Sequence, residues 1–314
     1  MRTITQLCIL CILITVTACQ NKPKSDSGDK IYVDFPSEMV EFIPYKKNPV
    51  FTGTGGNNWD KEIRERGYIL FEDNIYKMWY TGYNSEISDQ KFLGYATSLD
   101  GINWSKHPGN PVFSEKWTED MFVIKSENTY YMYAEGENDV AHLLVSADGI
   151  NWEEKGDLII RSTKGEPVPG PYGTPTILIE DGKWHLFYER NDEGVWLAMS
   201  DDKITWVNVQ DELVLKMGPA TYDLGAVAAN QLVKFKNKFY LYYHATSRPD
   251  WQQRPESDNI WTSNVAMSTD LLHWVKYPGN PIIEGDHSSP ILVFDSDQPC
   301  LFTMHSAVCR YSPK

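Results

Sequence analysis

Titratable residues recur at one position of a repeated aromatic strand. Copies of this strand, such as WHLFYE (184–189) and FYLYYH (239–244), are largely aromatic and aliphatic. Their last residues are Thr81, Glu135, Glu189, His244 and His305. A single charged strand end is often just a solvated residue. Four titratable ends in one register indicate instead a common site that offers acids and bases for proton transfer.

Charged residues also stand near the start of the strand that precedes each of these. Aligned on their turns, the five preceding strands have equivalent positions at Arg66, Asp120, Thr174, Ala229 and Ser289. Glu65 comes directly before Arg66. A hairpin brings the start of its first strand beside the end of its second strand. Both sets of residues are therefore expected at the same edge.

The elements that position these residues repeat five times. The turn and aromatic strand recur as EDNIYKMWYTG (72–82), SENTYYMYAEG (126–136), EDGKWHLFYER (180–190), KNKFYLYYHAT (236–246) and SDQPCLFTMHS (296–306). A period of about fifty residues, with several turns and no room for an ordinary helix, is typical of propeller blades. The predicted fold class is all-β, a five-bladed β-propeller. Its axial mouth is the expected ligand site.

The last copy lacks a fourth strand, and the N-terminal part of the chain supplies a matching segment. MVEFIPYKKNPVF (39–51) resembles GINWSKHPGNPVF (101–113) and LLHWVKYPGNPII (271–283). We therefore predict that a strand at about residues 39–51 completes the fifth blade and closes the ring. Such closure removes an exposed sheet edge that would favour aggregation.

Several repeated residues are interpreted as structural. The tryptophans that end the turn between the third and fourth strands are expected to pack between blades: Trp104, Trp152, Trp206 and Trp274. The aspartates of the same turns are expected to bond their own backbone: Asp100, Asp148, Asp202 and Asp270. Cys300 and Cys309 are expected to be unpaired, because the register of their hairpin places them off-pair.

The repeats YKMWYTG, GYATSLDGINW and YPGNP, together with the blade count, resemble the five-bladed propeller glycosidases over about residues 39–314. These include arabinanases, β-xylosidases, invertases and mannoside phosphorylases. In the arabinanase and xylosidase branch, the resemblance implies a base Asp on blade one, a pKa-tuning Asp on blade two and an acid Glu on blade three, usually with inversion. Asp120 matches the blade-two position, whereas Arg66 stands at the base position and Gly173-Thr174-Pro175 where the acid is expected.

Glycoside hydrolysis needs a proton donor for the leaving oxygen and a group that activates water. We expect Asp120 and Glu189 to be the central carboxylates, with Glu65 and Asp223 in reserve. His244 or His305 could act as the acid, since an imidazole titrates near neutrality. The alternative for each histidine is a structural hydrogen bond at a strand end.

Arginines and aromatic residues are the expected substrate contacts. A guanidinium matches a carboxylate or sulfate, so Arg64 and Arg66 suit an anionic sugar, unless they pair with Glu62 or Glu65. Aromatic faces pack against sugar rings. The expected substrate-binding residues are Arg64, Arg66, Glu135, Arg190, His305, Tyr172, Trp117 and Trp251. Proton-transfer chemistry of this kind requires no cofactor, and no His or Cys spacing predicts a metal; whether Ca²⁺ occupies the axis is left open.

The N-terminal residues indicate export. Residues 1–18 carry the apolar run LCILCILITV and end in a segment that, with Cys19, resembles a bacterial lipobox. This predicts a signal peptide (1–18), a lipidated Cys19, a flexible tether (19–38) and a catalytic propeller (39–314) anchored to the cell envelope. A formal net charge of −14 argues against nucleic acid or anionic lipid as a partner.

The leading hypothesis is a lipid-anchored, exo-acting glycoside hydrolase that trims a plant or algal oligosaccharide. The alternatives are a non-catalytic carbohydrate-binding propeller and a glycoside phosphorylase, in which Arg64 and Arg66 would bind phosphate. The sugar, the linkage, the stereochemical outcome and the oligomeric state do not follow from the sequence.

Overall fold

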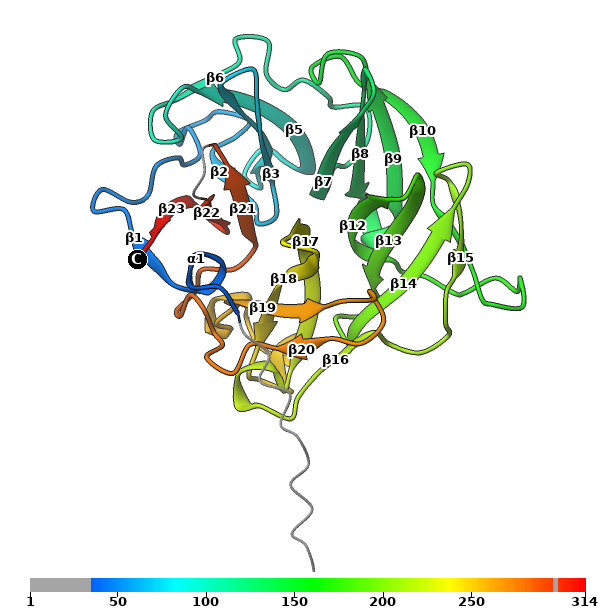
Figure 1. The fold of residues 1–314 in the computed structure, drawn as a ribbon. Coiled ribbons are helices and arrows are strands. Elements are labelled where there is room, and N and C mark those ends of the chain that lie inside the picture. The colour runs from blue at the N-terminus through cyan, green and yellow to red at the C-terminus, as the bar shows by residue number, and fades with distance from the viewer. Residues whose placement is uncertain (1–34, 296–298) are drawn as a thin grey trace, which may run out of the picture. The chain divides into compact units, whose positions relative to one another are not determined.

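The computed structural model describes residues 35–295 and 299–314, and these residues form five antiparallel sheets around one axis (Figure 1). The first sheet contains β3 (Tyr68–Glu72), β4 (Ile75–Asn84), β5 (Ser88–Ser98) and β6 (Trp104–Lys106), with β2 (Glu62–Ile63) beside β4. The second contains β7 (Glu119–Ser126), β8 (Thr129–Glu135), β9 (Ala141–Ser146) and β10 (Glu153–Asp157). The third contains β12 (Gly173–Glu180), β13 (Lys183–Glu189), β14 (Gly194–Ser200) and β15 (Thr205–Asn208), with β11 (Ile159–Arg161) parallel to β15 and β16 (Leu215–Lys216) beside β14.

The remaining two sheets complete the set. The fourth contains β17 (Ala226–Phe235), β18 (Lys238–Thr246), β19 (Thr262–Ser268) and β20 (Val275–Lys276). The fifth contains β21 (Pro290–Phe294), β22 (Pro299–Met304), β23 (Val308–Pro313) and β1 (Phe42–Pro44). Helical structure is limited to α1 (Ser37–Val40) and the single turns η1 (Glu137–Asp139), η2 (Thr221–Asp223), η3 (Trp251–Gln253) and η4 (Glu256–Asp258) in the described ranges. The described part of the chain contains no helix long and apolar enough to cross a membrane.

The innermost strands contact one another in a closed cycle. Their order around the axis is β3, β7, β12, β17, β21 and back to β3. Figure 1 shows these strands nearest the centre, with later strands of each sheet farther out. The predicted all-β, five-bladed propeller is therefore confirmed.

The N-terminal segment and the C-terminal hairpin share the fifth sheet. β1 pairs antiparallel with β23, with Phe42 opposite Pro313 and Pro44 opposite Tyr311. The strand is shorter than the segment 39–51, because the chain before it forms α1, which buries Met39 and Val40. The short β1 is thus the outermost strand of a sheet whose other three strands come from the C-terminal end.

A repeated asparagine shows that the N-terminal segment occupies the position of a fourth strand. Asn110 accepts a hydrogen bond from the Tyr95 N–H (2.9 Å) and donates one to the Tyr95 carbonyl (3.0 Å). Asn48 makes the same two bonds to Arg310 of β23, at 2.8 and 3.0 Å. Since Asn48 and Asn110 hold the third strand of their sheets identically, the two segments are structurally equivalent.

Aromatic side chains fill the space between neighbouring sheets. Each of the four repeated tryptophans contacts an aromatic ring of the preceding sheet, in the pairs Trp152–Trp79, Trp206–Tyr133, Trp274–Phe187 and Trp104–Phe302. The first three pairs join consecutive sheets and the fourth joins the first sheet to the fifth. Their predicted packing role is confirmed, and it places most of the core between the sheets.

Other structural predictions also hold. Each repeated turn aspartate accepts hydrogen bonds from the second and third following N–H groups, as Asp100 does from Ile102 and Asn103. Cys300 and Cys309 are both buried and free. They do not pair, because Cys309 stands opposite Thr303 and Cys300 opposite Val293.

The innermost strands share an unusual backbone conformation where they begin. Arg66, Asp120, Thr174 and Ser289 have φ of 55°, 48°, 46° and 58°. Non-glycine residues seldom adopt such values. Strand pairing shifts register here, between Glu119 and Phe122 in the second sheet and between Gly173 and Thr176 in the third. Bulges of this kind redirect side chains and are frequent beside functional sites.

Candidate active site

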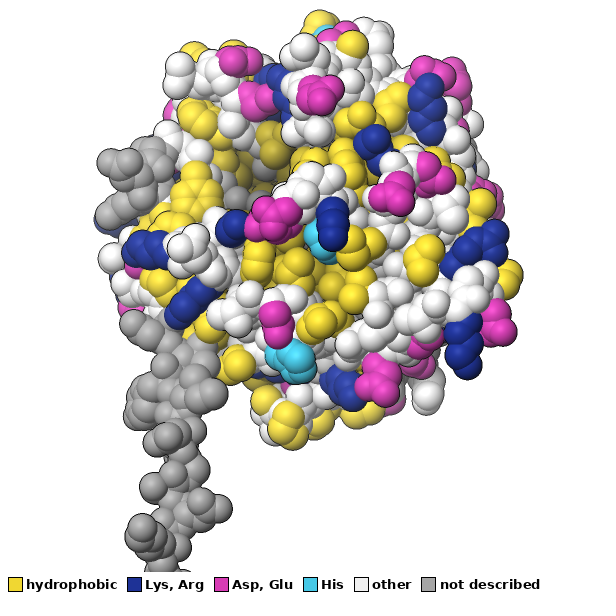
Figure 2. Space-filling model, turned by 45° about the vertical axis from the view of Figure 1, so that its right-hand side comes forward, with side chains coloured by type: hydrophobic (Ala, Val, Ile, Leu, Met, Phe, Trp, Pro, Cys, Tyr) yellow, Lys and Arg dark blue, Asp and Glu magenta, His cyan; other side chains and the backbone are white. Residues whose placement is uncertain are grey.

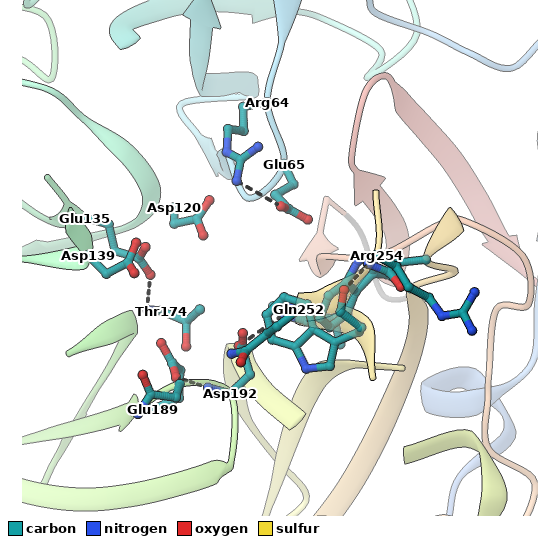
Figure 3. A pocket seen from close by; sticks show the side chains of 15 residues that line it. Arg64, Glu65, Asp120, Glu135, Asp139, Thr174, Glu189, Asp192, Gln252 and Arg254 are labelled. Carbon is teal, nitrogen blue, oxygen red and sulfur yellow. Dashed lines mark hydrogen bonds and ion pairs between the residues drawn. The ribbon is translucent and has the colours of Figure 1, made fainter. Parts of the chain in front are cut away.

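A pocket of about 350 Å³ lies where the innermost strands begin, at the edge that the sequence predicts. Its size is within the range of small-ligand sites. The lining residues come from four of the five sheets: Arg64, Glu65, Asp120, Glu135, Asp139, Thr174, Glu189, Asn191, Asp192, His244, Trp251, Gln252, Arg254, Asn259 and Trp261. Figure 3 shows their carboxyl groups gathered around one space.

Asp120 is a lining carboxyl with one oxygen that forms no hydrogen bond to the described residues. Its backbone lies at the bulge of β7, and its Oδ1 is buried without a hydrogen-bond partner among the described residues. Burial, together with the charges of Glu65 and Glu119, raises the Asp120 pKa well above the usual value, although Arg66 and Arg64 oppose this. Burial therefore favours the protonated form of this side chain, which keeps an oxygen free to contact a substrate.

Glu189 provides the carboxyl that the sequence pattern lacks on the third sheet. A Cβ added to Gly173 would lie 1.6 Å from Glu189 Oε1 and 3.0 Å from Glu135 Oε1. The two glutamates thus lie on either side of Gly173, and Glu135 also accepts a hydrogen bond from the Thr174 N–H. Burial raises the pKa of both glutamates, and Asp120 and Glu189 raise that of Glu135 further. Crowded carboxyls disfavour one another's ionisation.

Glu65 differs from these acids because it is held as a carboxylate. His305 Nδ1 lies 3.3 Å from Glu65 Oε2, and His305 Nε2 lies 3.3 Å from Asp286 Oδ2. Burial acts to raise the Glu65 pKa, but His305 and Arg64 outweigh it and lower the pKa to about 2. The same carboxylates overcome burial at His305 and raise its pKa to about 10. His305 is therefore a permanent cation behind Glu65, and it does not line the pocket.

Asp192 is a lining carboxyl that titrates close to neutrality. It lies in the turn between β13 and β14, and its N–H donates to Glu189 Oε2 at 2.5 Å. Burial and the charges of Glu65 and Asp120 raise its pKa to about 7. A group with this pKa exists in both protonation states near neutral pH, as an efficient general base requires.

His244 faces the pocket as an uncharged imidazole. Its Nε2 lies 3.9 Å from Asp192 Oδ1, and its ring packs against Trp261 with centroids 5.2 Å apart. Burial, and then the charge of Arg66, lowers the His244 pKa to about 3. At neutral pH the imidazole is therefore uncharged, which does not favour the predicted role of this histidine as the acid.

The long connection 247–261 in the fourth sheet forms one wall of the pocket. Trp251 packs edge-to-face on Trp261, with centroids 5.1 Å apart. Asn259 donates to the Trp251 carbonyl at 3.0 Å, and the Trp261 N–H donates to Asp286 at 3.1 Å. Aromatic rings supported in this way suit contact with a sugar face.

Seven of the residues proposed from the sequence line this pocket. They are Arg64, Glu65, Asp120, Glu135, Glu189, His244 and Trp251.

The other proposed residues are placed elsewhere by the structure. Asp223 is fully buried and paired with Lys276 of β20, so the expectation that it reaches the mouth is wrong. Arg190 lies over the Trp196 ring, with 5.6 Å between the guanidinium carbon and the ring centroid. Tyr172 donates its hydroxyl to the Val168 carbonyl.

Trp117 and Arg66 are also outside the lining. Trp117 donates to Glu119 at 2.6 Å and packs under Lys91. Arg66 is only 2% exposed. The proposed direct contacts of these residues with a substrate are therefore not supported by their positions.

Sequence reasoning missed a group of residues in connections between second and third strands. These are Asp139, Asn191, Asp192, Gln252, Arg254 and Asn259. The motif RNDEG (190–194) has the composition of an ordinary polar turn. The available signal was its place directly after Glu189, because a turn that follows a mouth-facing strand end also lies at the mouth.

The charges of the pocket do not suit an anionic substrate. Six carboxyl side chains line it, against the guanidinium groups of Arg64 and Arg254. Arg64 is itself engaged, with its Nε 2.6 Å from Glu119 Oε2 and an Nη 3.6 Å from Glu65 Oε1. The alternative that Arg64 pairs with neighbouring glutamates is thus the one that the structure supports.

The surface charge and the arrangement of potential metal ligands bear on what the protein could bind. On the face shown in Figure 2, acidic and basic side chains are interspersed, without one broad basic patch. No cluster of three or more His, Cys, Asp or Glu in residues 35–295 and 299–314 has a geometry that could hold a metal ion. Cys19 and the predicted signal peptide lie outside the described residues.

Comparisons with known proteins bear on this fold and site. A scan against protein-family models finds no match. The chain is 25% identical to the 1,2-β-oligomannan phosphorylase of Thermoanaerobacter sp. (strain X514) over 228 residues, which cover 66% of this chain and 72% of that protein.

Solved structures share the fold at low sequence identity. A glycosyl hydrolase from Bacteroides ovatus superposes with a TM-score of 0.68 at 16% identity, covering 89% of this chain and 96% of that one. A structure from the GH130 family of mannoside phosphorylases, which contains glycoside hydrolases that target β-1,2-mannosidic linkages in Candida mannan, gives 0.64 at 16% identity, covering 87% and 94%. The fold is thus that of five-bladed propeller glycoside hydrolases and mannoside phosphorylases.

Proposed function

We propose that this protein is an exo-acting glycoside hydrolase that removes a terminal, uncharged sugar, with a β-mannoside as the first candidate. The observation that carries the proposal is the presence, in one pocket, of Asp120, whose pKa burial raises well above the usual value, and Asp192, whose pKa is about 7. Two carboxyls in opposite protonation states are the requirement for acid–base glycoside cleavage.

In the proposed reaction, Asp120 donates its proton to the glycosidic oxygen as the bond from that oxygen to the anomeric carbon breaks. Asp192 accepts a proton from a water molecule, whose oxygen forms the new bond to the anomeric carbon. The products are a free sugar and a shortened alcohol, and the anomeric configuration inverts. Glu189 fixes the turn that carries Asp192 through the 2.5 Å hydrogen bond to its N–H.

The substrate proposal rests on the lining and on the relatives. Asn191, Gln252 and Asn259 offer amide groups for hydroxyl recognition, and Trp251 offers an aromatic face. The mannoside follows from the likeness to an oligomannan phosphorylase and to a structure from the mannoside phosphorylase family. The expected preference for a uronate or sulfated sugar is not retained, because Glu65 is an ionised lining carboxylate and both lining arginines are paired, Arg64 with Glu119 and Arg254 with Asp250.

Phosphorolysis is the second candidate, because the 25% identical relative is a phosphorylase. In that reaction phosphate would replace water and would have to enter the same acidic pocket. Arg64 is paired with Glu119 and Arg254 with Asp250 (2.6 Å), so neither guanidinium is held ready for an anion. The acidic lining therefore favours water as the nucleophile.

The direct test incubates the purified protein with β-1,2- and β-1,4-linked manno-oligosaccharides, with and without inorganic phosphate. Release of mannose without phosphate, with the inverted anomer seen by NMR, is the expected result. Formation of mannose 1-phosphate only when phosphate is present would establish the phosphorylase instead. Binding without cleavage of these sugars, or of arabino- and xylo-oligosaccharides, would identify a non-catalytic binding module.

The location in the cell envelope remains part of the proposal. It depends on Cys19 and the segment before it, which are known here only as sequence. Metabolic labelling with a fatty-acid analogue should modify the wild-type protein and not a Cys19→Ala variant. Equal labelling of both would exclude lipidation at this residue.

A further inference from the structure

Arg66 is a buried arginine at the junction of three sheets, close behind the active-site pocket. Its N–H donates to the Met304 carbonyl at the end of β22 (3.0 Å), and its own carbonyl accepts from the Met121 N–H of β7 (2.9 Å). Its backbone φ of 55° lies in the left-handed region, and only 2% of the residue is exposed. The backbone at Arg66 is therefore held in place by the fifth and second sheets.

The guanidinium of Arg66 has no partner among the described residues. Its Nε, Nη1 and Nη2 are all buried and form no hydrogen bond. A guanidinium carries five N–H donors, and burying its charge without compensation is costly. Arg64, two residues earlier, shows the ordinary solution in its 2.6 Å contact with Glu119. Arg66 thus contributes no local ion pair that would explain its burial.

The groups that Arg66 influences are those of the proposed reaction. Its charge acts on acids of the second and third sheets and on the imidazole of the fourth: Asp120, Glu135, Glu189, Asp192 and His244. The other charged groups near this cluster are Glu65, Arg64, Glu119, Asp139 and His305. Several carboxyls confined together resist ionisation, and one fixed cation among them offsets that resistance.

We infer that Arg66 is a positioning residue whose buried guanidinium, unpaired among the described residues, sets the charge of this acid cluster, so that a carboxylate base and a carboxylic acid can coexist in one pocket. The inference rests on the proposed function. Arg66 does so without touching the substrate, because it lies outside the pocket lining. Because its guanidinium nitrogens bind no single carboxylate among the described residues, the positive charge acts on the cluster as a whole.

The kinetic test compares the pH dependence of kcat/KM for wild type, Arg66→Met and Arg66→Lys. The acidic limb is the part of the pH profile in which kcat/KM rises with pH. Removing the cation should move this limb to higher pH by about one unit, which is the smallest pKa shift usual for a nearby opposite charge. Activity should then fall about tenfold at pH 6 and much less at pH 9. Arg66→Lys should restore the wild-type limb.

A second, partly buried cation provides the matched control. Lys276→Met removes a lysine paired with Asp223 away from the pocket, so it should lower stability without moving the limb. An unshifted limb in Arg66→Met, or an equal shift in Lys276→Met, would overturn the inference. If Arg66→Met does not fold, Arg66→Gln applies the same test with an uncharged polar side chain.

A measurement without substrate separates this inference from the proposed function. Carboxyls whose folded pKa is raised stabilise the fold below their unfolded pKa, and this stability is lost as pH rises through the folded pKa. Without Arg66 the folded pKa values rise further, so the unfolding free energy of Arg66→Met should fall, relative to wild type and Arg66→Lys, as pH increases from 5 to 9. A difference that does not change with pH would overturn the inference even if the wild type proved inactive on every glycoside.

Discussion

The Oε1 atom of Glu189 lies 1.6 Å from the point that a Cβ on Gly173 would occupy. The carboxyl of the second strand thus fills the position of a side chain on the innermost strand. This explains how the third sheet can present an acid at the mouth although Gly173-Thr174-Pro175 stand where the sequence resemblance predicts an acidic residue. The glycine is required for space, since its φ is not in the left-handed region.

Gly173→Ala should therefore displace Glu189. Because Glu189 fixes the Asp192 turn through the 2.5 Å bond, we expect kcat/KM to fall by at least about tenfold, with a smaller effect on stability. Steady-state kinetics and thermal unfolding measure the two effects.

Gly170→Ala is the matched control, because its new Cβ would meet nothing closer than 3.8 Å. A double-mutant cycle with Glu189→Ala completes the test. Once the carboxyl is gone, Gly173→Ala should have little further effect on activity. Independent, additive losses would show that Gly173 acts in some other way.

Asp120→Asn should lower kcat/KM on an oligosaccharide by about 10²–10⁴-fold, the usual contribution of a general acid. A substrate with a dinitrophenol leaving group needs little protonation and should lose much less. Asp157→Asn, at an exposed aspartate of β10, is the control and should retain activity. Equal losses on both substrates would remove Asp120 from the role of proton donor.

The pH profile follows from the two carboxyls. Asp192 must be ionised to accept a proton, so kcat/KM should rise as pH increases through about 7. Asp120 must be protonated, so activity should fall again at higher pH, above the raised pKa of this residue. Asp192→Asn should abolish most activity over the whole range. A wild-type optimum well below pH 6 would contradict the assignment of Asp192 as the base.

The fold could be predicted because its determinants are local and repeated. Each turn aspartate, each inter-sheet tryptophan and each Asn-Pro segment recurs at the blade period, so five weak signals reinforce one another. The strand ends Glu135, Glu189 and His244 could be predicted for the same reason, since the pleat and register of a repeated hairpin fix which end faces the axis.

The rest of the site depends on features that do not repeat. Asp192 and Asp139 lie in turns of different sequence, and Trp251 lies in a connection present on one sheet. The pKa of Asp192 results from burial among acids of other sheets, which spacing along the chain does not reveal. Asp223 is a residue that the sequence wrongly places at the mouth. It lies in a loop, but it is buried and paired with Lys276 of β20.

Trp251 should contribute binding rather than chemistry. Trp251→Ala removes an aromatic face from the pocket wall, and we expect KM to rise about tenfold, about 1.4 kcal/mol, with little change in kcat. Trp251→Phe should recover part of the loss. Phe294→Ala, at another partly exposed aromatic residue, is the control. A loss confined to kcat would show that Trp251 positions the reacting groups.

The joining of the two ends of the ring can be tested at Asn48. This side chain makes the same pair of hydrogen bonds to Arg310 that Asn110 makes to Tyr95 within the first sheet. Asn48→Ala and Asn110→Ala should therefore each lower the free energy of unfolding by about 1–3 kcal/mol, because both leave a partly buried N–H and carbonyl unsatisfied. Denaturant titration of the two variants measures this directly. If Asn110→Ala were costly and Asn48→Ala neutral, the two hydrogen bonds of Asn48 would contribute nothing to holding the N-terminal segment on the fifth sheet, and the backbone pairing of β1 with β23 would have to hold it.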